Sequence, residues 1–302
     1  MLYFCMGGMP GKSMKLKQKL STRYLRAQLN ILSAVSPRKS AVKAFRAIIR
    51  PRRRQKGKPP KIFETGEPLS FRFDGHTVRG HRWQPYSDDL RPTKEAAKKV
   101  LMVHGFESST KVFGHCITAL LKKGFEVVAF DAPGHGASGG KRLFVSDYAR
   151  MLTQIEEMFG PFQAWLAHSL GGLALALSLE DTQPEGRSAL VLVAPAPGVA
   201  RAAEEWTARL RLPADVLREM DEYVMETSGH PLGWYSLRRV IGSVGAEILY
   251  VQDEEDPVTP PEEARLIEQD RHPNIQFVFT TGLGHKKIFK DQEVLDRIVE
   301  FL

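Results

Sequence analysis

The stretch that most constrains the fold of this chain is Gln163–Leu177, which reads QAWLAHSLGGLALAL. An apolar run of the kind found in buried strands leads into HSLGG, and a second apolar run, typical of a buried helix, follows. The residues between the two runs leave room only for a sharp turn with Ser169 at its tip. Such a turn requires small residues two positions before and after the serine, and Ala167 and Gly171 stand there. The stretch therefore predicts a strand–turn–helix unit that holds Ser169 in a strained backbone conformation.

The rest of the chain alternates between strand-like and helix-like segments. A hairpin signal at Asp74-Gly75 separates the first two of eight expected strands, which are 69–74, 76–83, 100–103, 125–130, 164–168, 189–193, 248–251 and 275–280. Helices are expected between later strands at 110–123, 145–159 and 262–270, and at the end over 287–302. A hairpin followed by alternating strands and helices predicts an α/β fold with a mostly parallel, eight-stranded sheet and helices on both faces.

Charge divides the chain into two parts. No Asp or Glu occurs from Met1 to Lys61, a segment that holds 17 of the 43 Lys and Arg residues. The remaining 241 residues carry a formal net charge of −9. We therefore expect a basic, partly helical extension over 1–61 and an acidic globular domain over 62–302. Within the domain, a helical insert at about 197–245 is expected to form a small cap over the sheet.

The extension contains two expected amphipathic helices. Apolar residues recur at three- and four-residue intervals from Leu16 to Val35, Pro37 ends that pattern, and a second helix is expected over Ala41–Arg50. The basic linker RPRRRQKGKPPK follows. Three alternatives are open for the extension: a solvated tail whose apolar faces pack on the domain, a peripheral contact with an anionic membrane, or binding of nucleic acid. Nucleic acid is the least favoured, because aromatic residues are not interleaved with the basic ones.

The two cysteines, Cys5 and Cys116, provide no disulfide framework, so a reducing compartment is expected. The cytoplasm is the expected location, with the inner face of the membrane as a peripheral alternative. No apolar run in the sequence is long enough to span a bilayer. Residues with the spacing of metal ligands do not occur either, so neither a metal nor another cofactor is expected.

Reactive residue types follow several expected strands. Ser169 follows the strand 164–168, and the acidic loop after 248–251 offers Asp256 as the better placed carboxylate and Asp253 as the reserve candidate. His285 comes after the last strand and stands beside two glycines. Active sites in open α/β sheets collect at the carboxyl ends of parallel strands. The chain order Ser169, Asp256, His285 is that of a serine hydrolase triad on such a sheet.

Backbone N–H groups complete the predicted site. The N–H of Phe106, after the strand 100–103, and the N–H of Leu170, at the start of a helix, are expected to form a two-donor oxyanion hole. The glycine-rich loop 131–138 lacks the spacing and the Lys of a phosphate-binding loop and is expected to be a tight turn that shapes the pocket. Three further histidines near these turns are expected to be structural: His104, His135 and His168.

Together these motifs resemble the α/β-hydrolase superfamily, in its esterase, lipase and lysophospholipase-like branch. The motifs that carry the resemblance are HGF at 104–106, DAPGHGAS at 131–138, AHSLGG at 167–172, DEEDPV at 253–258 and GLGH at 282–285, and they cover about 69–302. The resemblance implies the α/β-hydrolase fold, with Ser169 as the nucleophile, His285 as the base and Asp256 as the acid that orients it. The basic extension lies outside the resemblance.

The expected substrate is a carboxylic ester with a small or medium acyl chain. A lysophospholipid or a monoacylglycerol becomes the better candidate if the extension contacts membranes. Aromatic residues of the insert, Trp206 and Trp234 among them, are expected to line an apolar acyl pocket. The alternative functions are an acyltransferase or a thioesterase with the same triad, and a binding protein that keeps the fold without turnover.

Overall fold

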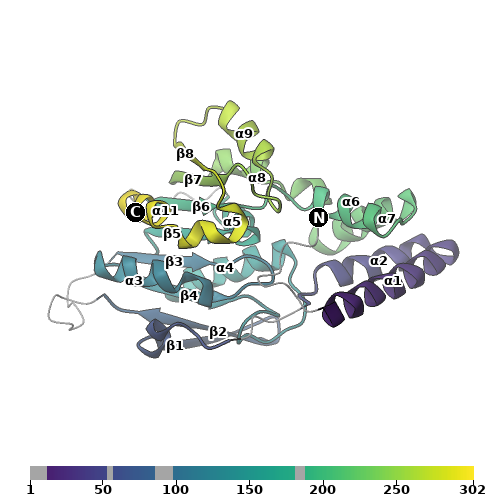
Figure 1. Cartoon of the computed structure of the whole chain (residues 1–302), viewed down its shortest axis with the longest axis horizontal. Coiled ribbons are helices and arrows are strands. Elements are labelled where there is room, and N and C mark those ends of the chain that lie inside the picture. The colour runs from purple at the N-terminus through teal and green to yellow at the C-terminus, as the bar shows by residue number, and fades with distance from the viewer. Residues whose placement is uncertain (1–11, 53–56, 86–97, 181–187) are drawn as a thin grey trace. The chain divides into compact units, whose positions relative to one another are not determined.

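A computed structural model gives the fold of residues 12–52, 57–85, 98–180 and 188–302 (Figure 1). The chain divides into two compact units. Unit 1 contains Met1–Arg50, as far as it is described, and Gly198–Ser236; unit 2 contains Pro51–Pro197 and Leu237–Leu302. All the named strands of the described chain belong to unit 2, and unit 1 is built from helices.

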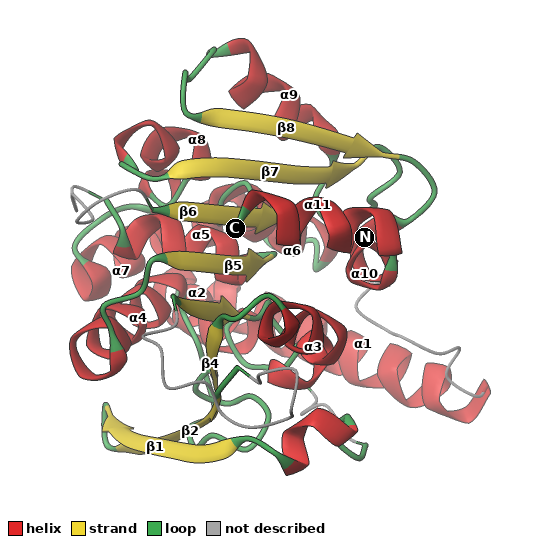
Figure 2. Ribbon diagram, turned by 90° about the vertical axis from the view of Figure 1, so that its left-hand side faces the viewer, coloured by secondary structure: helices red, strands yellow, loops and turns green. Residues whose placement is uncertain are grey.

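Unit 2 is organised around a sheet with the strand order β1-β2-β4-β3-β5-β6-β7-β8 (Figure 2). β1 and β2 form an antiparallel hairpin, β2 pairs antiparallel with β4, and every other neighbouring pair is parallel. The strands are β1 (Glu67–Phe73), β2 (His76–Trp83), β3 (Lys99–Val103), β4 (Glu126–Asp131), β5 (Ala164–His168), β6 (Ala189–Val193), β7 (Glu247–Asp253) and β8 (Ile275–Thr280). The expectation of a mostly parallel sheet of eight strands is confirmed.

Helices cover both faces of this sheet, as Figure 2 shows. α3 packs with α11 on one face, and α4 packs with α5 on the other, where α5 also contacts α8. The helices of unit 2 are η1 (Lys61–Glu64), η2 (Thr110–Phe113), α3 (Gly114–Lys122), α4 (Val145–Phe159), α5 (Leu170–Ser178), α8 (Leu237–Val240), η4 (Ile241–Ser243), α9 (Pro261–Gln269), α10 (Gly284–Lys287), η5 (Ile288–Lys290) and α11 (Gln292–Phe301). The central strands are nearly continuous apolar runs because both of their faces are covered.

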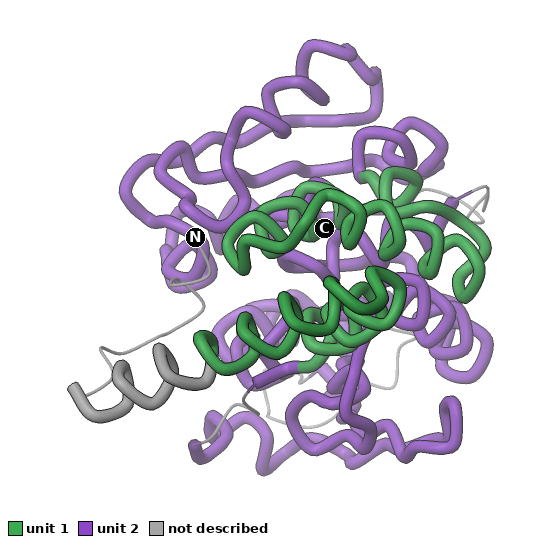
Figure 3. Tube along the Cα trace, turned by 90° about the vertical axis from the view of Figure 1, so that its right-hand side faces the viewer, with its two compact units in different colours: residues 1–50, 198–236 green, residues 51–197, 237–302 purple. Residues whose placement is uncertain are grey.

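Unit 1 joins the N-terminal helices to the helices of the insert (Figure 3). Its elements are α1 (Lys12–Val35), α2 (Pro37–Ile48), α6 (Ala200–Arg209), α7 (Ala214–Ser228) and η3 (Leu232–Trp234). α2 packs against both α1 and α7. The ring of Phe45 meets that of Tyr223 edge-on at 5.7 Å between centroids, and the Arg38 guanidinium lies over the same Tyr223 ring. None of the described helices is both long and apolar enough to cross a membrane.

The second N-terminal helix begins earlier than the sequence suggested. We expected it to start at Ala41, but α2 starts at Pro37, with Ser36 as its N-cap accepting a hydrogen bond from the backbone N–H of Lys39. Proline is compatible with the first turn of a helix, because the N–H that it lacks has no partner within the helix there. Pro37 therefore separates α1 from α2 by starting the second helix within two residues of the end of the first.

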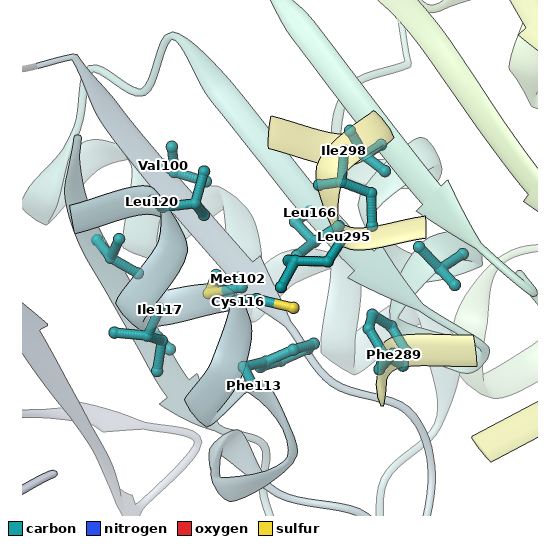
Figure 4. Packing of buried hydrophobic residues seen from close by; sticks show 14 of the residues in the cluster. Val100, Met102, Phe113, Cys116, Ile117, Leu120, Leu166, Phe289, Leu295 and Ile298 are labelled. Carbon is teal, nitrogen blue, oxygen red and sulfur yellow. The ribbon is translucent and has the colours of Figure 1, made fainter. Parts of the chain in front are cut away.

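The core on one face of the sheet lies under α3 and α11. Strand residues of one parity, such as Val100, Met102 and Leu166, pack there against Phe113 and Cys116 (Figure 4). Ile298 and Leu295 of α11 close the cluster from the other side. We expected one helix over 287–302, but this segment is divided: α10 ends at Lys287, and η5 and α11 follow. η5 places Phe289 edge-on against Phe113 in the same core.

Candidate active site

Ser169 lies in the turn between β5 and α5, in the conformation that its neighbours predicted. Its backbone dihedrals are φ 53° and ψ −126°, a region that non-glycine residues rarely adopt. A side chain at Gly171 would place its Cβ 2.6 Å from the backbone oxygen of His104, so this position cannot carry one without a shift. Ala167 is fully buried, and its methyl group is accommodated. The strained turn holds the serine at the carboxyl edge of the sheet.

Gly105 brings a second loop against Ser169. A Cβ added at Gly105 would lie 2.8 Å from the Cβ of Ser169 and 3.2 Å from Nδ1 of His168. Only a residue without a side chain can approach this closely. The loop after β3 therefore touches the loop after β5, which is the proximity that an oxyanion hole built from both loops requires.

His285 and Asp256 form a buried pair. Nδ1 of His285 lies 2.7 Å from Oδ2 of Asp256, and both side chains are almost completely buried. Asp253, the reserve candidate for this contact, makes its hydrogen bonds to other groups. His285 was expected in a loop, but it is the second residue of the short helix α10, where it is 7% exposed. Gly282, shortly before this helix, and Gly284, its first residue, both adopt positive φ.

Hydrogen bonds hold the Asp256 carboxylate in place. The backbone N–H groups of Val258 and Thr259 donate to Oδ1 over 2.7 and 3.1 Å, and the Thr259 hydroxyl donates to Oδ2 over 2.8 Å. Burial alone would raise the pKa of Asp256. This effect is outweighed by the hydrogen bond and the charge of His285 and by the hydrogen bonds from the Val258 N–H and the Thr259 hydroxyl, so the pKa of Asp256 is lowered. The carboxylate is therefore charged at neutral pH and can orient the imidazole.

A continuous set of contacts links this pair back to the serine turn. Oγ1 of Thr259 lies 3.4 Å from the backbone oxygen of Ala194, and the N–H of Ala196 donates to the backbone oxygen of Ser169 over 2.9 Å. On the other side, Nε2 of His168 lies 3.1 Å from the backbone oxygen of His285. Residues 169, 256 and 285, far apart in the sequence, therefore converge through their immediate neighbours.

The histidines that were expected to be structural have backbone partners. Nε2 of His104 accepts from the N–H of Ala132, and its Nδ1 lies 2.8 Å from the oxygen of Gly105. Nε2 of His135 accepts from the N–H of Glu107, and its Nδ1 lies 2.9 Å from the oxygen of Pro133. Burial lowers the pKa of His104 despite the nearby Asp131 charge, so this ring is neutral. Both rings tie the loop after β3 to the loop after β4.

Asp131 is the residue that shapes the glycine-rich loop. Its Oδ1 accepts from the N–H of Thr110 over 2.8 Å, and its Oδ2 accepts from the N–H of Ala137 over 2.8 Å. Gly136, at φ 42°, lies so close that any side chain there would collide with this carboxylate. The loop is a tight turn around a buried carboxylate, in agreement with the expectation from its sequence.

Some predicted site residues stay predictions. Leu170 is the first residue of α5, so its N–H has no acceptor within the helix and is available to an oxyanion. Phe106 follows Gly105 and stacks edge-on against His135 at 5.3 Å, which places its backbone beside the serine turn. Trp206 and Trp234 lie in unit 1, in α6 and η3, and their predicted place in a pocket remains a prediction. Among the described residues, no three His, Cys, Asp or Glu side chains are grouped so that they could hold a metal ion.

Sequence reasoning missed the role of Thr259, which donates its hydroxyl to Asp256. It named Asp253 as the reserve candidate for the contact with His285, but it did not foresee that Asp253 binds the segment before His285. The position of Thr259 three residues after Asp256 is a signal that could have found it, because an Asp followed by such N–H and hydroxyl donors commonly closes a local turn. The contacts of Asp253 with that segment gave no comparable signal, because Thr280 and Leu283 lie 27 and 30 residues away.

Known proteins share this architecture. The family described as serine aminopeptidase S33 matches residues 94–227, less than half of the chain. A pimeloyl-[acyl-carrier protein] methyl ester esterase from Klebsiella pneumoniae is 35% identical over 107 residues, which are 35% of this chain and 40% of that protein. The solved structure of an esterase from Pyrococcus furiosus matches with a TM-score of 0.60 at 19% identity, over 84% of this chain and 97% of that one.

A monoacylglycerol lipase from Paleococcus ferrophilus also matches, with a TM-score of 0.54 at 21% identity, over 74% of this chain and 97% of that one. The chain thus spans less than half the length of the curated relative that it matches, but nearly the whole of both solved structures. At this low identity the structural likeness to the two solved structures shows the fold alone.

Proposed function

We propose that the chain, which has the fold of solved esterase structures, is a member of the α/β-hydrolase superfamily and a serine hydrolase that cleaves a carboxylic ester. The observation that carries this proposal is the buried 2.7 Å contact between His285 and Asp256 at the sheet edge that also bears Ser169. A charged carboxylate on Nδ1 fixes the imidazole so that Nε2 is the nitrogen that can take a proton. Such an arrangement suits a general base for a serine hydroxyl.

The proposed reaction uses these groups in turn. Ser169 Oγ attacks the carbonyl carbon of the ester while its proton passes to His285, and Asp256 stabilises the imidazolium that forms. The N–H groups of Phe106 and Leu170 donate to the oxyanion of the tetrahedral intermediate, and each lowers the activation barrier by about 3 kcal/mol. His285 then protonates the leaving alcohol, and a water molecule, activated by the same imidazole, hydrolyses the acyl enzyme.

The proposed substrate is a small or medium acyl ester. The names of two similar proteins support an ester bond: one is a methyl ester esterase and the other a monoacylglycerol lipase. A monoacylglycerol or a lysophospholipid is the more specific candidate. The family description names an aminopeptidase, so aminoacyl anilides belong in the same assay.

The test is labelling and turnover with the purified full chain. A fluorophosphonate probe should label the wild type and not Ser169→Ala, and a series of p-nitrophenyl esters of increasing chain length should be hydrolysed by the wild type alone. Product analysis with added alcohol or thiol acceptors separates hydrolysis from acyl transfer. An unlabelled wild type, or a Ser169→Ala variant that keeps the activity, contradicts the proposal and leaves a binding protein as the better interpretation.

We also propose that unit 1 contacts anionic membranes through α1. Tyr24, Ile31 and Val35 are 67%, 71% and 81% exposed, and their spacing of seven and four residues places them on one face of the helix. Leu29 and Ser33 are buried on the face that packs towards α2, which leaves the first face without a partner among the described residues of unit 1.

Charge favours an anionic partner for this face. The segment Met1–Lys61 has no acidic residue, and Arg23 of α1 and Lys39, Lys43 and Arg46 of α2 are exposed. Each basic residue near anionic headgroups contributes about 1 kcal/mol to binding, and an exposed apolar line adds burial in the interface. An anionic lipid surface therefore matches both features of this helix.

Vesicle flotation tests this contact. The wild type should float with vesicles that contain phosphatidylserine and less with pure phosphatidylcholine, and the double variant Ile31→Ser/Val35→Ser should lose most of the binding. Met158→Ser, which removes an exposed apolar side chain from unit 2, is the matched control. Point variants are preferable to deletion, because α2 packs against α7 within unit 1. Equal flotation of the double variant, or a preference for nucleic acid over vesicles, overturns the proposal.

A further inference from the structure

Asp253 is a buried carboxylate next to the proposed catalytic pair but separate from it. It is the last residue of β7, it is 0% exposed, and it lies opposite Thr280, the last residue of β8. The sequence presents it three residues before Asp256, where it was the reserve candidate for the contact with His285. Since Asp256 makes that contact, Asp253 must be explained by its other partners.

The partners of Asp253 lie on the segment that leads into His285. Its Oδ2 accepts from the Thr280 hydroxyl over 2.8 Å and from the N–H of Leu283 over 3.0 Å. Its Oδ1 accepts from the N–H of Glu255 over 3.1 Å, in the turn that carries Asp256. A single carboxylate therefore joins the turn after β7 to the turn after β8, and these turns supply the acid and the imidazole.

Asp253 is ionised although it is buried. Burial opposes its ionisation, but hydrogen bonds from the Gly284 N–H, the Thr280 hydroxyl and the N–H groups of Leu283 and Glu255 outweigh burial and lower its pKa. A carboxylate without a surrounding of this kind is strongly disfavoured in a protein interior. A residue that only filled space would need neither a charge nor four hydrogen-bond donors around it.

The turn that Asp253 holds is difficult to fix by backbone preference alone. Gly282 and Gly284 adopt φ of 82° and 58°, and a Cβ built at either meets nothing within 4 Å. Glycines in open space leave a turn free to move, because they access more backbone conformations than other residues. On the far side of this turn, the backbone oxygen of His285 is held by Nε2 of His168 at 3.1 Å.

We propose that Asp253 is a positioning residue that fixes the turn 281–284, so that the His285 imidazole stays aligned with Asp256. This inference rests on the proposed function, in which His285 is the base. It assigns separate tasks to the two carboxylates of the DEED segment: Asp256 binds the ring, and Asp253 binds the main chain that carries the ring. A displacement of about 1 Å in a catalytic group can lower a rate by about 100-fold, so a firmly held turn has a direct effect on turnover.

Asp253→Asn is the test variant. An amide has one acceptor oxygen, so its NH₂ group must face at least one of the donors that the carboxylate now satisfies. We expect kcat for ester hydrolysis to fall by about 10- to 100-fold, the range for groups that orient a functional side chain, with KM changed less than about twofold. Labelling by a fluorophosphonate should slow in proportion. Thr280→Val, which removes one of the donors, should show a smaller change in the same direction.

Glu156→Gln is the matched control. Glu156 also accepts a backbone N–H, from Phe162 over 3.1 Å, but it lies before the amino end of β5, at the edge of the sheet opposite Ser169. It should leave kcat and the labelling rate unchanged. A role for Asp253 in stability alone predicts a lower melting temperature in Asp253→Asn with kcat of the folded protein unchanged, and that result overturns the proposal.

Proton NMR separates failure of this inference from failure of the proposed function. The downfield signal of the His285 Nδ1 proton, assigned by its loss in His285→Gln, should shift or broaden in Asp253→Asn and stay in place in Glu156→Gln. That outcome supports positioning even if the wild type hydrolyses no ester. An unchanged signal together with an unchanged labelling rate refutes it. If Asp253→Asn does not fold, the same measurements on Thr280→Val decide.

Discussion

The imidazole of His168 lies against the imidazole of His285, with their ring centroids 4.6 Å apart and Nε2 of His168 3.1 Å from the backbone oxygen of His285. A carbonyl oxygen only accepts, so Nε2 of His168 carries the proton. Its Nδ1 is buried without a hydrogen-bond partner in the described part of the chain. The residue before the proposed nucleophile is therefore a neutral donor to the residue proposed as the base.

Stability should fall on acidification because of this histidine. Burial, followed by the neighbouring His285 charge, lowers the pKa of His168 well below its ordinary value of 6.5. The unfolded chain therefore takes up a proton near pH 6.5 that the folded chain does not, and the free energy of unfolding decreases as the pH falls below that value. His168→Asn should show a shallower decrease.

Urea unfolding at about pH 7.5 and about pH 5.5 measures this difference. The decrease in the free energy of unfolding between these two pH values should be smaller in the variant but not absent, because burial also lowers the pKa of His104. An equal decrease in the wild type and in His168→Asn would show that the protonation of His168 does not differ between the folded and unfolded chains.

Gly105→Ala should impair the proposed reaction strongly. The new Cβ would lie 2.8 Å from the Cβ of Ser169, so either the serine turn or the loop bearing Phe106 must move. We expect kcat to fall about 100-fold or more, because both the proposed nucleophile and a proposed oxyanion donor lie at this contact. Steady-state kinetics and the fluorophosphonate labelling rate measure it.

A close approach of the same distance elsewhere provides the control. A Cβ at Gly242 would lie 2.8 Å from the His272 ring, before β8 and away from the carboxyl edge of the sheet. Gly242→Ala should therefore lower stability without a comparable loss of kcat. If both variants lose activity equally, the contact of Gly105 with Ser169 has no special importance.

Asp256→Asn should lower kcat by about 10⁴-fold while the protein stays folded. The amide cannot stabilise a positive imidazole, and its NH₂ group can turn the ring to the wrong tautomer. The hydrogen bonds from Val258 and Thr259 can still be accepted by the amide oxygen, which is why we expect the fold to survive. Steady-state kinetics measures the loss of kcat, and circular dichroism shows whether the variant stays folded. A variant that keeps more than about a tenth of the wild-type kcat contradicts the assigned role of Asp256.

Cys116 should be inert in the folded protein. Burial raises the pKa of its thiol to about 12, and it is packed in the core beside Phe113. The thiolate is the reactive form, so iodoacetamide should modify Cys116 only after unfolding. Mass spectrometry of the peptide that contains Cys116 measures its modification with and without urea. The peptide also distinguishes Cys116 from Cys5, which lies outside the described residues. Equal modification in both conditions would show that this part of the core opens readily.

Much of the fold could be predicted from the sequence because its signals are local. The strands β5 and β6 are short apolar runs, and their limits were predicted to the residue, as were those of α4 and β8. The turn at Ser169 was predictable because only small neighbours permit its backbone conformation. In each case the chemistry that determines the structure lies within a few residues.

Other features depend on contacts between distant residues and could not be read in advance. β4 lies between β2 and β3 in the sheet, although the chain reaches β3 first. The DEED segment offered two carboxylates, and which of them meets His285 depends on where the turn after β8 lies. The N-terminal helices were expected as an extension, and only the structure shows that α2 packs against α7.

The packing of α2 on α7 has a consequence for synthesis of the chain. Nη1 of Arg38 donates to the backbone oxygen of Glu219, 181 residues further on. At a ribosomal rate of roughly 5–20 residues per second, α2 leaves the ribosome on the order of ten seconds or more before α7 exists. During that interval the side chain of Phe45, which later packs on Tyr223, lacks its partner. A helix that is made well before its partner is thus completed only when that partner emerges, and chaperones have a long opportunity to bind α2 in the meantime.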